Sequence, residues 1–332
     1  MDRGPATVAG ARRHRAADVP GLVERARSGD ARAVARLISL VEDASPLLRE
    51  VMAALAPYAG QAHIVGITGA PGVGKSTSTS ALVTALRQQD KRVGVLAVDP
   101  SSPFSGGALL GDRVRMQDHA LDRGVYIRSM ASRGHLGGLS WATPQALRVL
   151  DAAGCDAILV ETVGVGQSEV DIASLADTTV VLLAPGMGDG IQAAKAGILE
   201  IGDLYVVNKA DRDGANALRR ELRSMLGLAD RSEHAWKPDI VQTVANTGEG
   251  VDTVVAALDR HRAWLAESGE LQARRTHRAR DEIEAIALTS LREQWRSFHE
   301  RTELDVLAEK VVAGDTDPYA AADELLAETA TD

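Results

Sequence analysis

Apolar residues in the middle of the chain are concentrated in short, mostly apolar runs, and stretches of mixed polarity separate these runs. Seven of the runs have the length and the β-branched composition of strands, and they cover residues 64–68, 92–98, 125–130, 157–163, 179–184, 204–208 and 240–244. Strands that are apolar at successive positions are buried on both faces, which is typical of a mainly parallel sheet covered by helices. The pattern therefore predicts an α/β fold in which ligands bind at the carboxyl ends of the strands.

The chain on either side of these strands has helical spacing. Asp30 is a candidate N-cap for a helix whose apolar residues lie three or four positions apart, at Val34, Leu37, Ile38 and Val41. Near the other end, a short apolar seam steps by three, four and three residues through Leu288, Leu291, Trp295 and Phe298. Such a seam on a terminal arm favours contact with a second subunit, and packing within the chain is the alternative.

A phosphate-binding loop lies between the first strand and a helix predicted over residues 77–86. Residues 69–76 follow the pattern G-x-x-x-x-G-K-[ST], whose glycines let backbone N–H groups point at one anion beside a helix N-terminus. Lys75 would neutralise the β- and γ-phosphates, and the Ser76 hydroxyl would hold Mg²⁺. A glycine-rich turn that binds nothing is the alternative. The residues expected to contact the nucleotide here are Gly69, Ala70, Pro71, Gly72, Val73, Gly74, Lys75, Ser76 and Thr77.

The tetrapeptide Asn208-Lys209-Ala210-Asp211 follows the predicted strand 204–208 and is a candidate reader of the base. The Asp211 carboxylate can accept from both N1–H and the exocyclic amine of guanine, a pattern that adenine lacks. Asn208 can meet the opposite edge of the base, and the Lys209 stem can cover its face. This assignment favours GTP and GDP over ATP. The alternative is that Asp211 only starts the helix predicted over 213–226.

Several carboxylates follow other strands and predict a magnesium shell. Asp99 comes after strand 92–98, Asp112 lies in a glycine-rich loop, and Glu161 opens a D-x-x-G-like turn that ends at Gly164. Neighbouring carboxylates repel one another unless a cation lies between them. We therefore expect Ser76, Asp99, Asp112 and Glu161 to organise Mg²⁺, with the Gly164 N–H near the γ-phosphate. For Asp112, an ordinary turn role is the alternative.

Two further features concern the rate of GTP hydrolysis and the way in which the nucleotide state could reach a bound protein. Gln167 lies three residues beyond Gly164, whereas fast small GTPases carry a water-orienting Gln directly after that glycine. This displacement predicts slow intrinsic hydrolysis that a partner accelerates, and a binding module that does not hydrolyse GTP is also compatible with it. The loop 185–190 has three glycines, and the helix after it carries Lys195, so it could pass the nucleotide state to a bound protein.

Composition limits the classes of function. The chain has 332 residues and a net charge of −9, without a basic stripe for nucleic acid and without an apolar stretch long enough for a membrane span. Its single cysteine, Cys155, excludes an intrachain disulfide and fits the reducing cytoplasm. We divide the chain into a disordered tail (1–17), an N-terminal helical extension (18–60), a P-loop GTPase domain (61–265) and a C-terminal helical dimerisation arm (266–332).

The motifs together resemble those of one family. The phosphate-binding loop, the strings Asp99–Phe104, Arg133–Gly138 and Glu161–Glu169, and the tetrapeptide at 208–211 are similar to those of the MeaB/ArgK family of P-loop GTPases, which belongs with the signal-recognition and metallochaperone GTPases. The resemblance implies a G-protein chaperone that binds adenosylcobalamin-dependent methylmalonyl-CoA mutase, gates cofactor loading and protects the mutase from inactivation. It also implies a homodimer joined through the C-terminal arm.

The resemblance adds residues to the candidate site. Asp189 and Lys195 match the third switch of the family, so they join Lys75, Asp99, Glu161 and Gln167 as candidate catalytic residues. The last guanine-contacting loop of the family usually reads Ser-Ala, whereas the corresponding stretch here is Val244-Ala245-Asn246.

Two other functions remain as alternatives. A metal-delivery GTPase of the hydrogenase or urease type needs a Cys/His cluster, and this chain has one cysteine and eight dispersed histidines. A kinase or ATPase associated with amino-acid transport would need an acceptor site and a membrane partner. No feature of the sequence indicates either.

Overall fold

The computed structural model describes residues 18–100, 119, 121–132, 142–162, 168–186, 199–228, 235–298 and 301–329. The chain divides into two compact units, residues 1–274 and residues 275–332.

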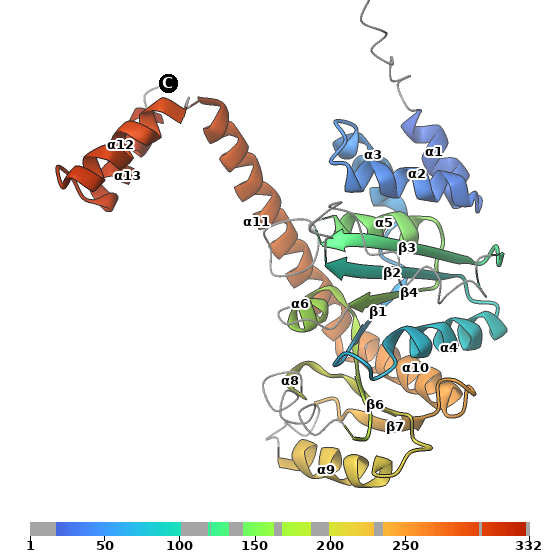
Figure 1. The fold of residues 1–332 in the computed structure, drawn as a ribbon. Helices are drawn as coiled ribbons and strands as arrows, with labels where there is room; N and C mark the ends of the chain where they lie inside the picture. The colour runs from blue at the N-terminus through green and yellow to red at the C-terminus, as the bar shows by residue number, and fades with distance from the viewer. Residues whose placement is uncertain are drawn as a thin grey trace, which may run out of the picture. The chain divides into compact units, whose positions relative to one another are not determined.

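Within the described residues of the first unit, seven strands form one parallel sheet (Figure 1). The strands are β1 (His63–Thr68), β2 (Val93–Pro100), β3 (Val125–Ser132), β4 (Ala157–Thr162), β5 (Thr178–Leu183), β6 (Leu204–Asn208) and β7 (Asp239–Thr243). Their order across the sheet is β3-β2-β4-β1-β5-β6-β7, so β1 lies at the centre between β4 and β5. All seven predicted strands are confirmed, with ends that differ by at most two residues.

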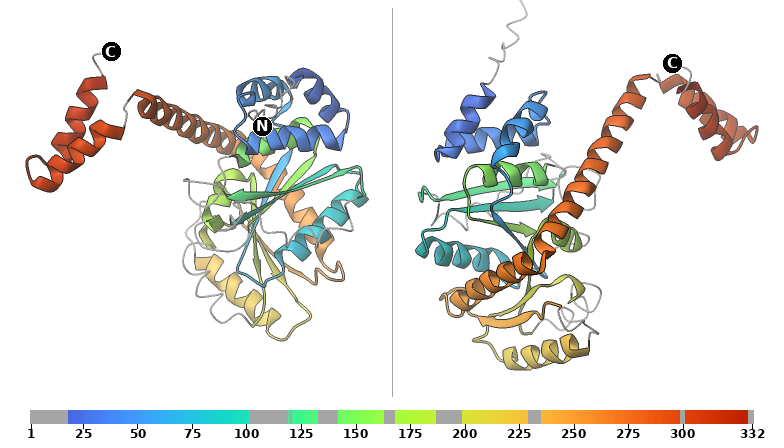
Figure 2. Two further views of the ribbon diagram at one scale, coloured as in Figure 1. Left: turned by 45° about the horizontal axis from the view of Figure 1, so that its top comes forward. Right: turned by 180° about the vertical axis from the view of Figure 1, so that it is seen from behind.

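Helices cover both faces of the sheet, which makes a three-layer α/β/α arrangement (Figure 2). One face packs against α4 (Lys75–Gln88) and α10 (Val251–Ser268). The other face packs against α5 (Thr143–Ala152), α6 (Ser168–Leu175) and α9 (Ala215–Leu228). A three-residue helix, α8 (Leu199–Ile201), precedes β6.

Alternation along β2 shows why these strands read as continuous apolar runs. Val93 and Val95 join the cluster under α4 and α10, whereas Leu96 and Val98 join the cluster under α5. Each of these side chains is almost completely buried, and burying one valine or leucine contributes roughly 1.5–3 kcal/mol. Both faces of the central strands therefore need apolar residues, as the sequence pattern predicts.

The N-terminal extension folds as three helices and one 3₁₀ turn: α1 (Val19–Arg27), α2 (Ala31–Glu42), α3 (Leu48–Leu55) and the turn Ala56–Tyr58. Asp30 caps α2 as predicted, because its carboxylate accepts from the backbone N–H groups of Arg32 at 2.9 Å and Ala33 at 3.4 Å.

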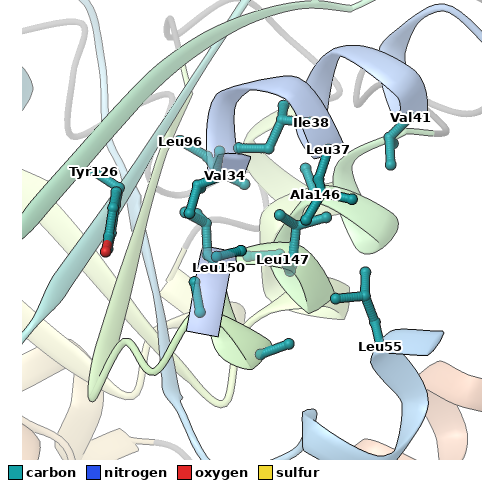
Figure 3. Close-up of a cluster of buried hydrophobic side chains, with 14 of the residues drawn as sticks. Val34, Leu37, Ile38, Val41, Leu55, Leu96, Tyr126, Ala146, Leu147 and Leu150 are labelled. Atoms are coloured by element: carbon teal, nitrogen blue, oxygen red, sulfur yellow. The ribbon is translucent and has the colours of Figure 1, made fainter. Parts of the chain in front are cut away.

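The apolar face of α2 joins the core of the first unit (Figure 3). Leu37 and Ile38 of α2 lie in one buried cluster with Leu147 and Leu150 of α5 and with Leu96 of β2. The extension therefore packs against the layer that covers the sheet, in agreement with the helical spacing of its apolar residues.

The helix α11 (Glu270–Phe298) begins in the first unit and continues into the second, which also contains α12 (Arg301–Ala313) and α13 (Pro318–Thr329). α12 and α13 pack as a hairpin around Leu307, Ala321 and Leu325. The side chains of Trp295 and Phe298 in the predicted seam lie outside those that the structure describes. No described helix is both long and apolar enough to cross a membrane.

Candidate nucleotide-binding site

The carboxyl ends of the central strands bring together segments that are far apart in the sequence. Ile67 near the end of β1 pairs with Glu161 of β4, and Asn208 at the end of β6 pairs with Thr243 of β7. The phosphate-binding loop follows β1 directly, so it lies at the centre of this edge. This is the edge at which parallel α/β sheets bind ligands.

The loop 69–74 adopts the backbone conformation that its glycines permit. Gly69, Gly72 and Gly74 have φ values of +144°, +81° and +98°, which side chains disfavour. A Cβ on Gly69 would overlap the carbonyl oxygen of Leu182, and one on Gly74 would come within 2.5 Å of Asn208 Nδ2. The loop therefore fits closely between the ends of β5 and β6, and α4 begins immediately after it.

Lys75 is buried at the first turn of α4. Its Nζ donates hydrogen bonds to the carbonyl oxygens of Gly69 at 2.6 Å and Ala70 at 3.2 Å. The ammonium group thus lies inside the curl of the loop, next to the positive end of the helix dipole. Both features favour an anionic group at this position, as predicted for the phosphates of a nucleotide.

Ser76 and Glu161 form the part of the predicted magnesium shell that the structure describes. The Ser76 hydroxyl donates to Glu161 Oε1 at 2.6 Å, and Glu161 is 2% exposed. A hydroxyl and a carboxylate within this distance are oxygen ligands of the kind that Mg²⁺ uses, so the residues present fit the ion. No described residues form a group of three or more His, Cys, Asp or Glu with metal-binding geometry.

Other predicted members of the site cannot be placed with these two. Asp99 lies in β2, whose backbone pairs with β3 there, but its side chain is not among those described. The remaining candidates lie outside the described residues altogether: Asp112, Gly164, Gln167, Asp189 and Lys195.

Asn208 connects three loops of the site. Its Nδ2 donates to the carbonyl oxygen of Val73 at 2.8 Å, and its Oδ1 accepts from Ala245 N at 3.1 Å and Thr243 Oγ1 at 3.3 Å. The side chain is 2% exposed. These three bonds leave one N–H of the amide for the edge of a base, so the predicted base contact shares this side chain with a structural role.

Lys209 also connects the end of β6 to the phosphate-binding loop, from the exposed side. Its Nζ donates to the Gly72 carbonyl oxygen at 2.7 Å, and its φ of +56° is unusual for a residue with a side chain. The stem of Lys209 therefore spans from the end of β6 to the phosphate-binding loop. Asp211 is exposed, and α9 begins only at Ala215, so Asp211 does not occupy the N-cap position of that helix.

The stretch 244–246 is brought to the site by Asn208. Val244 N donates to Glu249 O at 3.0 Å, which closes a tight turn, and Ala245 is buried beneath it. Asn246 is exposed. Sequence reasoning missed Thr243, whose hydroxyl supports Asn208, although its place at the end of a predicted strand was a signal that could have found it.

The fold and this site define a P-loop nucleotide-binding protein of the parallel α/β class. The chain belongs to the MeaB family, because residues 34–300 match the model described as "Methylmalonyl Co-A mutase-associated GTPase MeaB". It is therefore a GTPase by family, and the predicted resemblance is confirmed.

Individual relatives agree with this assignment. A Pyrococcus abyssi protein that is provisionally named a GTPase is 48% identical over 309 residues, covering 92% of this chain and 95% of the relative. The mouse "Methylmalonic aciduria type A homolog, mitochondrial" is 38% identical over 266 residues, which cover 79% and 64%. A solved structure described as "Crystal structure of LAO/AO transport system kinase" matches with a TM-score of 0.72 and 27% identity, over 96% of this chain and 99% of that one.

Proposed function

We propose that this GTPase is a chaperone of adenosylcobalamin-dependent methylmalonyl-CoA mutase that gates cofactor loading and protects the mutase from inactivation. The family match carries the proposal, because the matching model is described as mutase-associated and covers residues 34–300. The name of the mouse relative, which refers to methylmalonic aciduria, points to the same metabolic client.

The chain's own residues support binding of GTP in one orientation. The loop amides and Lys75 would hold the β- and γ-phosphates, while Asn208, Lys209 and Asp211 would hold guanine. Because Asn208 and Lys209 both bond to carbonyls of the phosphate-binding loop, the two halves of the nucleotide would be read by one connected structure. Hydrolysis is then attack of water on the γ-phosphate, with the developing charge stabilised by Lys75 and the loop amides.

Mg²⁺, when bound, would neutralise negative charge on the phosphates of the nucleotide. Ser76 and Glu161 are the described residues that would hold it, and Asp99 and Asp112 are the further predicted ligands. The buried Glu161 carboxylate is suited to this role, because a charged group inside a protein needs a partner of opposite charge or strong hydrogen bonds.

Transmission to the mutase is assigned to the loop after β5. Pro185 and Gly186 open that loop, and the φ of Gly186 is +83°. Asp189 and Lys195 are the predicted relay residues, and Gln167 is the predicted catalytic residue whose displacement makes hydrolysis depend on the partner. Client binding would complete the site, and GTP hydrolysis would change the affinity for the mutase.

The homodimer belongs to the same proposal. Among the side chains of α11 that the structure describes, four large apolar ones, Ile283, Ile286, Leu288 and Leu291, are each at least 47% exposed. Large apolar side chains grouped on one helix are suited to burial against another subunit. Analytical sedimentation of the wild type and of a Leu288→Asp/Leu291→Asp variant would test the homodimer. We expect the wild type to be a dimer and the variant to be a monomer. A monomeric wild type would refute the assignment.

The test of the proposed function is copurification of the protein with methylmalonyl-CoA mutase in GDP and in a non-hydrolysable GTP analogue. We expect nucleotide-dependent association and faster phosphate release from GTP when the mutase is present. Faster turnover of ATP than of GTP, or failure to associate in either nucleotide, would overturn the proposal.

Two other functions give different readouts. Metal delivery predicts tight stoichiometric binding of Ni²⁺ or Zn²⁺, but the single cysteine is buried and burial raises the pKa of its thiol to about 12. A kinase predicts transfer of the γ-phosphate to a protein instead of to water. The similar solved structure is described as that of a transport system kinase, and that description names no acceptor for the phosphate.

A further inference from the structure

Three strands that reach the nucleotide site are each preceded by an aspartate at the opposite edge of the sheet. Asp156 comes directly before β4, Asp177 before β5 and Asp203 before β6. They differ in exposure, because Asp156 is exposed whereas Asp177 and Asp203 are buried. What they share is one pattern of hydrogen bonds to a neighbouring strand.

The backbone N–H and the carboxylate of each aspartate bond to the same residue, which lies in the adjacent strand or directly before it. Asp156 N donates to Arg92 O at 2.8 Å, while Arg92 N donates to Asp156 Oδ2 at 2.7 Å. Asp177 N donates to Ile64 O at 2.8 Å, while Ile64 N donates to Asp177 Oδ2 at 3.1 Å. Both pairs close a ring just before the regular ladder of parallel strands begins.

Asp203 repeats the pattern and adds further contacts. Asp203 N donates to Thr179 O at 2.9 Å, and Thr179 N donates to Asp203 Oδ2 at 2.8 Å. Arg274, in the first turns of α11, donates to both carboxylate oxygens of Asp203 at 3.0 Å and to the Asp177 carbonyl oxygen at 2.9 Å. Trp236 Nε1 donates to Asp203 O at 2.7 Å. Asp203 is therefore held from several sides at once.

These paired hydrogen bonds matter because the apolar pattern of the strands does not specify their register against the neighbouring strands. A strand with one apolar face loses burial if it slips by one residue, but β4, β5 and β6 are buried at every position. A slip would exchange one apolar face for another. A slip would move each carboxylate away from the N–H that it accepts from, at Arg92, Ile64 or Thr179, and losing that bond leaves a backbone N–H without its partner.

The far ends of the same strands touch the phosphate-binding loop. Glu161 accepts from Ser76, the Leu182 carbonyl oxygen lies against Gly69, and Asn208 donates to Val73 O. Each of these three residues stands five positions after its aspartate, at 161, 182 and 208. At about 3.3 Å per residue the two ends are roughly 17 Å apart. The register of each strand at the aspartate edge of the sheet thus sets the position of its residue beside the phosphate-binding loop.

We propose that Asp156, Asp177 and Asp203 are positioning residues for the nucleotide site, each setting the register of the strand that it precedes. Asp156 positions Glu161, and Asp203 positions Asn208 and the guanine-reading residues after it. The inference rests on the proposed roles of Glu161 in holding Mg²⁺ and of Asp211 in reading guanine. It differs from a purely stabilising role, because each aspartate should affect only the function at the end of its own strand.

The experiment compares Asp203→Ala and Asp156→Ala with Asp239→Ala as a matched control. Asp239 also begins a strand, β7, but its carboxylate bonds to the exposed Arg260 side chain. Two binding readouts are taken for each full-length variant. One is the ratio of affinities for GDP and IDP, which lacks the exocyclic amine that Asp211 would read. The other is the Mg²⁺ concentration that half-maximally slows release of a fluorescent GDP.

We expect Asp203→Ala to lower the GDP-to-IDP ratio by about tenfold and to leave the Mg²⁺ midpoint unchanged. Asp156→Ala should raise the Mg²⁺ midpoint by about tenfold and leave the GDP-to-IDP ratio unchanged. Asp239→Ala should change neither. If both alanine variants lower only the melting temperature, or if each changes both readouts equally, the proposal is overturned.

A conservative variant keeps the test valid if Asp203→Ala does not fold. The amide oxygen of Asp203→Asn can still accept from Thr179 N, so this variant should retain at least half of the wild-type GDP-to-IDP ratio; a loss as large as that expected for alanine would refute the register argument. Wild-type protein that binds neither GDP nor IDP would instead refute the proposed function, so the two failures are distinguishable.

Discussion

Replacing Asn208 with alanine would separate the guanine-reading segment from the phosphate-binding loop. The side chain makes three hydrogen bonds, to Val73 O, Ala245 N and Thr243 Oγ1, and it is 2% exposed. A buried protein hydrogen bond contributes about 1 kcal/mol net, so the variant should lose about 3 kcal/mol of unfolding free energy. The loop that Val73 O helps to hold should also become less well ordered for phosphate binding.

Urea unfolding and calorimetric titration with GDP and Mg²⁺ measure these two effects separately. We expect Asn208→Ala to lower the free energy of unfolding by about 3 kcal/mol and the affinity for GDP by at least about tenfold. Asn246→Ala is the control, because this exposed asparagine lies in the adjacent turn. It should alter stability by less than about 0.5 kcal/mol. An Asn208→Ala protein with wild-type stability and GDP affinity would refute the reasoning.

Three other predictions concern different parts of the first unit. Gly66→Ala should lower the urea unfolding free energy by about 1–3 kcal/mol, because a Cβ there would lie 2.9 Å from a side chain of α6, whereas Gly227→Ala in open space on α9 should not destabilise. Lys75→Ala should weaken GTP binding by at least about tenfold in calorimetry, since it removes the cation inside the loop. Burial lowers the pKa of His63 and of His261 from 6.5 to about 4 in the folded protein. Below pH 6.5 these histidines therefore bind more protons in the unfolded chain than in the folded one. Stability from these histidines should therefore be complete above pH 6.5 and fall as the pH drops toward 4, as measured by urea unfolding across that range.

Each of these has a contradicting result. Equal unfolding free energies for the two glycine variants would show that α6 does not approach β1 closely. Wild-type GTP affinity in Lys75→Ala would remove Lys75 from the site; the control is Lys91→Ala, since Lys91 pairs with Asp259 of α10 and not with the loop. A His63→Gln/His261→Gln variant should have a flatter pH profile than the wild type between pH 6.5 and 4. An identical slope would assign the pH dependence to other groups.

Local patterns in the sequence were sufficient for much of this fold. The seven strands were predictable because each is a run of apolar residues whose burial on both faces needs no distant information. The cap at Asp30 was equally local, since a capping side chain bonds to N–H groups only two and three residues away. The phosphate-binding loop was recognisable because its glycines, Lys75 and Ser76 are contiguous.

Contacts between segments far apart in the chain could not be predicted from the sequence, because packing alone decides which segments come together. Strands that are apolar on both faces fit any neighbour, so their order in the sheet and their register are not encoded in their periodicity. Asn208 was predicted to read a base, yet its amide is turned toward Val73, a residue 135 positions earlier in the chain. The Ser76–Glu161 bond likewise joins residues 85 positions apart. The sequence alone determined which segments are strands, helices and anion-binding loops, and the tertiary structure decided which side chains share the nucleotide site.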